Sequence, residues 1–200
     1  ELVKVIPCAE KIRFAASGTE ATFYAIRFAK AYTGRPRVLK FEGAYHGAHD
    51  VGVMSLFPQK LLPFPTPEPT SAGTSKKIQE EVLIAPFNDL KTTRRMIDQY
   101  GDEIACVITE PLQRCTPPVK GFLEGSREMT RKKGVLLIFD EVVTGFRLAY
   151  GGAQEYYGVT PDLAAFGKAM GGGYPIGAVC GRADILDLCT ESNLGKERYV

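Results

Sequence analysis

The sequence lacks the features that would mark a nucleic-acid-binding, membrane or secreted protein. Its 200 residues carry a formal net charge of only +2 with no prominent basic cluster, so nothing indicates a nucleic-acid partner. The longest apolar runs have the length of strands, so no membrane-spanning segment is expected, and no signal peptide is recognisable. With 44% hydrophobic and 24% charged residues, the composition is that of an ordinary soluble globular protein.

Paired cysteine motifs are also missing. The five cysteines are odd in number and form no CxxC pair, which argues against a disulfide framework and against a cysteine metal site. We therefore expect reduced thiols in a cytoplasmic protein. The five are Cys8, Cys106, Cys115, Cys180 and Cys189.

The two ends of the sequence suggest part of a longer protein. The chain opens on Glu1 without a starting methionine, close to a strand-like run, and it stops at Val200 soon after a helical stretch. We therefore expect a fragment.

Strand-like runs alternate with helical patterns along the whole chain. This alternation, with strands that are apolar throughout, predicts an α/β domain whose mostly parallel sheet is covered by helices on both faces. Asn88 is expected to cap the helix after it, and Gly34, Gly101 and Gly134 are expected to end helices. The predicted strands are Ile12–Ala16, Arg37–Phe41, Glu81–Ala85, Ile104–Thr109, Val135–Phe139, Leu163–Phe166 and Ile176–Cys180, and the predicted helices are Glu20–Tyr32, Asp89–Tyr100, Leu123–Lys133 and Ala183–Leu188.

One long stretch, Phe57 to Lys77, fits neither element. It contains five prolines followed by a run of serine, threonine and glycine, so it cannot form a regular helix or an interior strand. A loop of this length is either an inert surface excursion or functional, for example a lid over an active site. The sequence leaves both interpretations open.

A lysine and an aspartate stand at the ends of two apolar runs. Lys168 follows Leu163–Phe166 and lies between Gly167 and a triple glycine, while Asp140 follows Val135–Phe139. A lysine can hold an aldehyde as a Schiff base and an aspartate can keep a pyridine nitrogen protonated, which together suit pyridoxal phosphate chemistry. Lys168 could instead be a surface lysine, and Asp140 a metal ligand or the partner of Arg147. A Walker A loop is excluded because Ala169 follows the lysine.

Three further positions place polar groups at predicted strand ends. Ser17-Gly18-Thr19-Glu20 has capping-box spacing and predicts a helix start, which is either a simple cap or an anion site. Tyr45 could stack on a planar ring, and Glu110 ends another apolar strand. Ligands bind at the carboxyl ends of such strands. His46, His49 and Asp50 superficially resemble a metal cluster, but no third strong ligand has a fitting spacing, so no metal is expected.

These motifs, in this order, resemble the class III pyridoxal-phosphate aminotransferases over nearly all 200 residues. Two later segments resemble the branch that contains glutamate-1-semialdehyde aminomutase. The general motifs are Ser17-Gly-Thr-Glu-Ala21, Phe41-Glu-Gly-Ala-Tyr-His-Gly47, Glu110-Pro111, Phe139-Asp-Glu-Val-Val-Thr-Gly-Phe-Arg147 and Phe166-Gly-Lys-Ala-Met-Gly-Gly-Gly173, and the branch motifs are Tyr150-Gly-Gly-Ala-Gln-Glu155 and Thr160-Pro-Asp162. The segment Leu112–Pro118 departs from the aminomutase pattern, and the proline-rich stretch falls where aminomutases have a gating loop.

The resemblance implies a PLP-dependent transferase of fold type I and a role for each site residue. Lys168 would bind pyridoxal 5′-phosphate covalently and act as the base, and Asp140 would pair with the pyridine nitrogen. Ser17, Gly18 and Thr19 would hold the phosphate. Tyr45 and Val142 would pack on the two ring faces, and Glu110 would lie near the phenolic oxygen.

The expected function is therefore transfer of an amino group between an amino donor and a keto acid or aldehyde. The alternatives are glutamate-1-semialdehyde 2,1-aminomutase activity, which runs both halves on one substrate, and a catalytically incompetent fragment. The resemblance further implies a homodimer. Residues 1–200 would form its cofactor-binding large domain, without the N-terminal segment and the C-terminal small domain that members of the family carry.

Overall fold

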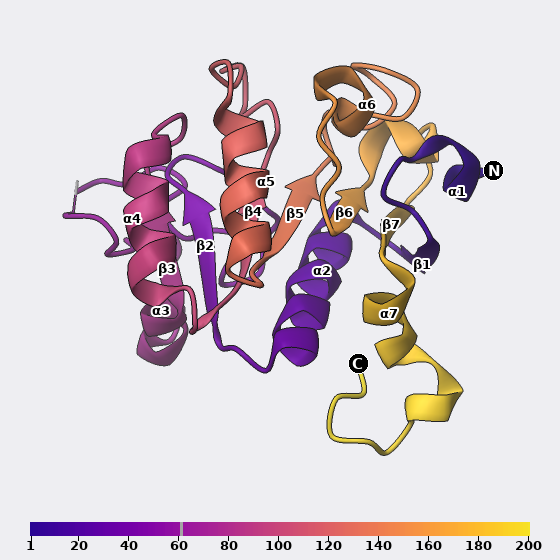
Figure 1. Cartoon of the computed structure of the whole chain (residues 1–200), viewed down its shortest axis with the longest axis horizontal. Coiled ribbons are helices and arrows are strands. Elements are labelled where there is room, and N and C mark those ends of the chain that lie inside the picture. Colours follow the sequence, from indigo (N-terminus) through magenta and orange to yellow (C-terminus); the bar gives the residue numbers. More distant parts are fainter. Residues whose placement is uncertain (61) are drawn as a thin grey trace.

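The computed structural model describes residues 1–60 and 62–200, so that Leu61, within the proline-rich stretch, lies outside the described residues. It contains seven strands and a set of helices that mostly alternate with them (Figure 1). The strands are β1 (Lys11–Ala15), β2 (Arg37–Phe41), β3 (Val82–Ala85), β4 (Ile104–Thr109), β5 (Leu136–Asp140), β6 (Leu163–Phe166) and β7 (Gly177–Gly181). The α-helices are α1 (Leu2–Val5), α2 (Gly18–Thr33), α3 (Lys76–Glu81), α4 (Leu90–Tyr100), α5 (Phe122–Lys132), α6 (Ala153–Tyr157) and α7 (Ala183–Leu186), and three short 3₁₀ turns begin at Lys168, Asp187 and Glu191.

The strands form one mixed sheet in the order β1-β7-β6-β5-β4-β2-β3. The pairs from β6 to β3 are all parallel, whereas β7 runs antiparallel to both of its neighbours. Because β1 and β6 are both antiparallel to β7, β1 points in the same direction as the parallel strands. The carboxyl ends of six strands therefore meet at one edge of the sheet, as the mostly parallel α/β prediction requires.

Helices cover both faces of this sheet, which confirms the predicted layers. On one face, buried side chains of the strands pack against α4 and α5 through Met96, Ile97, Phe122 and Met129. On the other face, α2 and α7 supply Ile26, Phe28 and Ile185. Alternate residues of a strand point to opposite faces, so strands buried on both sides are apolar throughout.

Most helix ends follow their predicted causes, with one correction. Ser17 caps α2 and Gly34 ends it in the left-handed conformation, while Gly101 and Gly134 stand at or just after the ends of α4 and α5. The prediction that Asn88 caps α4 was wrong, because Asp89 accepts the amide of Thr92 instead.

Asn88 instead links two loops. Its φ is 66°, and its side chain bonds the carbonyl oxygen of Pro117 and the amide of Val119. Asn88 therefore joins the turn before α4 to the loop before α5.

Three short helices were not predicted. The N-terminus of α6 is capped from a distance, since Glu141 accepts the amides of Ala153 and Gln154 at 2.6 and 3.1 Å. Ser75 caps α3 at the end of the proline-rich stretch, and α1 is a single turn at the start of the chain. Helices this short leave little periodicity in a sequence.

The proline-rich stretch lies along the edge strand of the sheet. The amide of Ile84 in β3 donates to the carbonyl oxygen of Pro65 at 3.0 Å, and the amide of Ser55 donates to Glu68 at 2.7 Å. Its function as a gating lid stays a prediction. In the part of the chain that the structure describes, no helix has the length and apolar character needed to cross a membrane.

Candidate functional site

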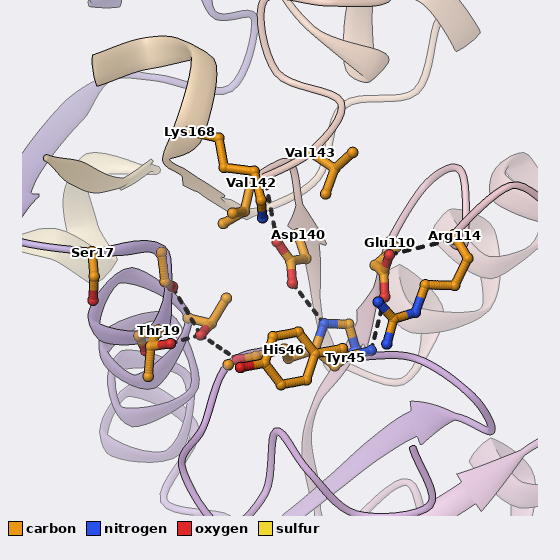
Figure 2. Close-up of a pocket in the computed structure, with 13 residues that line it drawn as sticks. Ser17, Thr19, Tyr45, His46, Glu110, Arg114, Asp140, Val142, Val143 and Lys168 are labelled. Carbon is orange, nitrogen blue, oxygen red and sulfur yellow. Dashed lines mark hydrogen bonds and ion pairs between the residues drawn. The ribbon is translucent and has the colours of Figure 1, made fainter. Parts of the chain in front are cut away.

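A cavity of about 290 Å³ lies at the carboxyl edge of the sheet, beside the N-terminus of α2 (Figure 2). The eight predicted site residues all line it, although they come from five separate parts of the chain: Ser17, Gly18, Thr19, Tyr45, Glu110, Asp140, Val142 and Lys168. Five lining residues had not been assigned to this site from the sequence: Thr22, His46, Gly47, Arg114 and Val143.

The start of α2 forms one end of the cavity. Ser17 Oγ accepts the amide of Glu20 at 3.1 Å, so Ser17 caps the helix as predicted. The carboxylate of Glu20 accepts the amide of Ala16 at 2.8 Å, one residue before the position that a full capping box would use. The amides of Gly18 and Thr19, at the first two helical positions, have no carbonyl partner within the helix. With the positive end of the helix dipole, these two amides form a site suited to an anion.

Glycine is required where three chain segments meet beside this helix start. A Cβ atom on Gly18 would lie only 2.7 Å from Cγ1 of Val142, and one on Gly167 would lie 3.3 Å from the Cα atom of Gly18. The backbones after β1 and β6 therefore approach each other closely, and the Val142 side chain, from the segment after β5, packs against both. This contact brings Val142 and Lys168 next to the anion site.

Asp140 lies at the end of β5 with an exposed fraction of only 5%. Its Oδ2 atom is 2.8 Å from Nδ1 of His46, and its Oδ1 atom accepts the amide of Val142 at 3.1 Å. The predicted alternative of a pair with Arg147 is wrong, since that guanidinium bonds the carbonyl oxygen of Val143. His46 is fully buried, and its Nε2 atom has no hydrogen-bond partner among the described residues.

The loop between β2 and the proline-rich stretch carries both Tyr45 and His46. The amide of Tyr45 donates to Oε1 of Glu110 at 2.8 Å, and the hydroxyl of Thr22 in α2 donates to the carbonyl oxygen of His46 at 2.5 Å. In Figure 2 the Tyr45 ring lies on the opposite side of the cavity from Val142 and Lys168.

His49 extends the same loop without contributing to a metal cluster. Its Nε2 atom lies 3.2 Å from the hydroxyl of Thr22, and burial, followed by the nearby His46, lowers its pKa to about 4. Within residues 1–60 and 62–200, no group of three or more potential metal-ligating side chains is present.

Lys168 enters the cavity from a strained backbone. It follows β6 directly through Gly167 and has a φ of 42°, in the left-handed region that a residue with a side chain rarely adopts. Strain of this kind persists only where the surrounding structure imposes it, and it gathers at functional sites. The side chain lines the same cavity as Asp140.

A second lysine, Lys40 in β2, holds the loop that carries Tyr45 and His46. It is fully buried, and its Nζ atom donates to the carbonyl oxygens of Ala44, Gly52 and Met54 at 2.9, 3.1 and 2.5 Å. An ammonium group has three donors, so this one is fully satisfied. The three bonds close the loop that carries Tyr45 and His46. Lys40 could not be identified from the sequence, because a single lysine in a strand carries no distinctive pattern.

Comparison with known proteins identifies the family. The family model described as aminotransferase class-III matches residues 1–197. Glutamate-1-semialdehyde 2,1-aminomutase from Methanocaldococcus jannaschii is 48% identical over 190 residues, which cover 94% of this chain and 44% of that protein. The chain thus spans less than half the length of this curated relative.

Solved structures of transaminases share the fold. An omega-transaminase from Sphaerobacter thermophilus superposes with a TM-score of 0.89 at 43% identity, covering 96% of this chain and 45% of that one. A transaminase with PLP bound gives a TM-score of 0.88 at 32% identity, with the same coverage.

The Lys40 bonds generate a prediction about stability. Replacing Lys40 with methionine should lower the free energy of unfolding by about 1 kcal/mol or more at pH 6, because three buried carbonyl groups lose their donor. Burial lowers the pKa of Lys40 to about 7, from 10.5 for an ordinary lysine. At a pH between about 7 and 10.5, Lys40 keeps its proton in the unfolded chain but has lost it in the folded chain. The contribution of Lys40 to the free energy of unfolding therefore rises with pH in this range.

Urea unfolding of wild type and Lys40→Met at pH 6 and pH 9 measures both effects, with Lys91→Met as the exposed control. The difference between wild type and Lys40→Met should grow by roughly 2–3 kcal/mol from pH 6 to pH 9. An equal difference at the two pH values would show that Lys40 does not titrate in this range.

Proposed function

Because the chain belongs to the class-III aminotransferase family, we propose that it binds pyridoxal 5′-phosphate and forms the cofactor-binding large domain of a longer enzyme. That enzyme transfers an amino group from a small amino donor to a keto acid or aldehyde. The α/β fold, with its seven-stranded mixed sheet, is that of the pyridoxal-phosphate-dependent transaminases, known as fold type I.

The residues of the cavity fit this cofactor. The observation that carries the proposal is the buried carboxylate of Asp140 in the same cavity as Lys168. Two carboxylate oxygens offer about four acceptor positions, and His46 and Val142 occupy one each. Capacity remains for a further N–H donor, such as a protonated ring nitrogen. At one end of the cavity, the amides of Gly18 and Thr19 with the hydroxyl of Ser17 suit a phosphate.

Tyr45 and Val142 suit the two faces of a planar ring. Tyr45 is held through its amide by Glu110, and Val142 is held against Gly18. Glu110 itself is 5% exposed and directly follows β4, and it would lie near the ring's phenolic oxygen.

Once bound, pyridoxal phosphate supplies an electron sink for the carbon that carries the amino group. Asp140 would keep the proton on the ring nitrogen, with its carboxylate held in place by Nδ1 of His46. Lys168 Nζ would hold the cofactor through its aldehyde carbon at rest. Once an amino donor displaced it, the freed Lys168 amine would be placed to take the proton from the donor's amino-bearing carbon and to deliver it to the former aldehyde carbon of the cofactor.

A second function is supported by a specific observation, the 48% identity to a glutamate-1-semialdehyde 2,1-aminomutase. Such an enzyme would use the same residues but move the amino group within one substrate. The omega-transaminase, at 43% identity, supports transfer between two substrates. Stoichiometry separates the two, because isomerisation of the semialdehyde needs no second substrate, whereas transfer consumes a donor and an acceptor in equal amounts.

The proposal extends to assembly and location. A homodimer with its sites at the subunit interface is proposed from the family resemblance. A cytoplasmic location is supported by the five free cysteines found among the described residues, which are typical of reducing compartments.

Replacing Lys168 with alanine should abolish amino transfer, since covalent attachment and the base disappear together. The base alone contributes roughly 10²- to 10⁴-fold. Turnover of the full-length enzyme, with Lys120→Ala as an exposed control, measures the loss. Retention of activity within about tenfold of wild type would remove Lys168 from the mechanism. A wild-type protein that stays colourless with excess cofactor would instead indicate an incompetent chain.

Replacing Asp140 with asparagine should keep the fold and much of the cofactor affinity but slow proton removal by roughly 10²-fold or more, because a neutral amide cannot stabilise a protonated ring nitrogen. Single-turnover kinetics and cofactor titration, with Asp98→Asn as the surface control, separate the two effects. A large loss of affinity with a normal rate would make Asp140 a purely structural residue.

A further inference from the structure

An arginine lies at the end of the cavity away from the helix start. Arg114 lines the cavity, and its side chain is exposed. Figure 2 shows it beside Glu110 and Tyr45, on the opposite side of Asp140 from Ser17 and Thr19. The cavity therefore has two regions that attract anions, the amides of α2 at one end and a guanidinium at the other.

The backbone holds Arg114 firmly in an uncommon conformation. Its φ is 56°, and its amide donates to Oε2 of Glu110 at 3.3 Å. Two backbone hydrogen bonds between Gln113 and Thr116, of 3.0 and 2.8 Å, close the turn around it. A side chain fixed by a strained turn at the mouth of a cavity is typical of a functional position.

The guanidinium of Arg114 contacts neutral groups, so its positive charge is not paired with a carboxylate side chain among the described residues. Its Nε atom donates to the carbonyl oxygen of Gly43 at 3.4 Å, and its Cζ atom lies 5.6 Å from the ring centre of Tyr45 and 5.9 Å from that of Phe57. None of the ion pairs found between described residues includes Arg114. The neighbouring Glu110 carboxylate already accepts two backbone amides.

We propose that Arg114 binds the carboxylate of the substrate, so that the enzyme acts on amino acids and keto acids in preference to simple amines and ketones. The proposal rests on the amino-transfer function. Two terminal nitrogens of a guanidinium match the two oxygens of a carboxylate. With the cofactor's phosphate at the α2 end, a substrate reaching Lys168 can place its carboxylate at the Arg114 end.

The first experiment compares donors that differ only in a carboxylate. The pairs are alanine with ethylamine and 3-aminobutanoate with isopropylamine, assayed with the full-length holoenzyme, with Arg114→Gln and with Arg114→Lys. Arg131→Gln, an exposed arginine of α5, is the control. Arg114→Gln should lower the ratio of kcat/KM for acid over amine by roughly 10- to 100-fold, mainly through KM, because a charge-assisted pair is lost. Arg114→Lys should recover part of the ratio.

An equal loss for acids and amines would overturn the proposal and leave Arg114 as a support for Tyr45. A ratio that does not change in Arg114→Gln would also overturn it. If wild type turns over none of the four donors, the amino-transfer function fails for these substrates, and a binding experiment decides the role of Arg114 by itself.

That second experiment uses ligands without an amino group. Calorimetric titration with butanoate and with neutral butanamide measures carboxylate binding directly. Wild type and Arg131→Gln should bind butanoate more tightly than butanamide, and Arg114→Gln should lose this preference. Equal binding of the two ligands by wild type, or a preference that survives in Arg114→Gln, would contradict the proposal.

Discussion

The hydrogen bond between Asp140 and His46 is the constraint on which the candidate site depends. The two residues are 94 positions apart in sequence, and β4 lies between their strands in the sheet order β5-β4-β2. The loop after β2 must therefore cross the end of β4 to reach Asp140. Where the loop passes the end of β4, Glu110 accepts the amide of Tyr45. A carboxylate that is 5% exposed is costly without partners, and this crossing loop supplies one.

A buried lysine makes this loop possible. Residues 44–54 expose carbonyl groups to the interior, where an unpaired acceptor is unfavourable. Lys40 satisfies three of these carbonyls with one ammonium group, while Thr22 and the close approach of Gly47 to Thr19 attach the loop to α2. The position of the Tyr45 ring thus depends on the side chain of a lysine buried in the sheet.

Much of the fold and the centre of the site could be predicted from local sequence. Fully apolar runs marked buried strands, and polar residues directly after them marked the carboxyl edge, which led to Asp140, Glu110 and Lys168. The helix cap at Ser17 could also be predicted from neighbouring residues alone. His46 could not be identified as the partner of Asp140, because its spacing to His49 suggested only a weak metal pattern. Arg114 was missed because it lies in an irregular turn whose conformation is set by Glu110 and Gln113, through contacts that periodicity does not report.

The central claim is that Lys168, among the lysines of this chain, binds the cofactor. The most direct measurement is borohydride reduction of the full-length protein with pyridoxal 5′-phosphate, followed by digestion and mass spectrometry of the peptides. The cofactor's mass should be added to the peptide that contains Lys168, at one site per chain, and to no other peptide in comparable amount. Labelling spread over exposed lysines, or labelling at another residue while Lys168 stays unmodified, would contradict the proposed site.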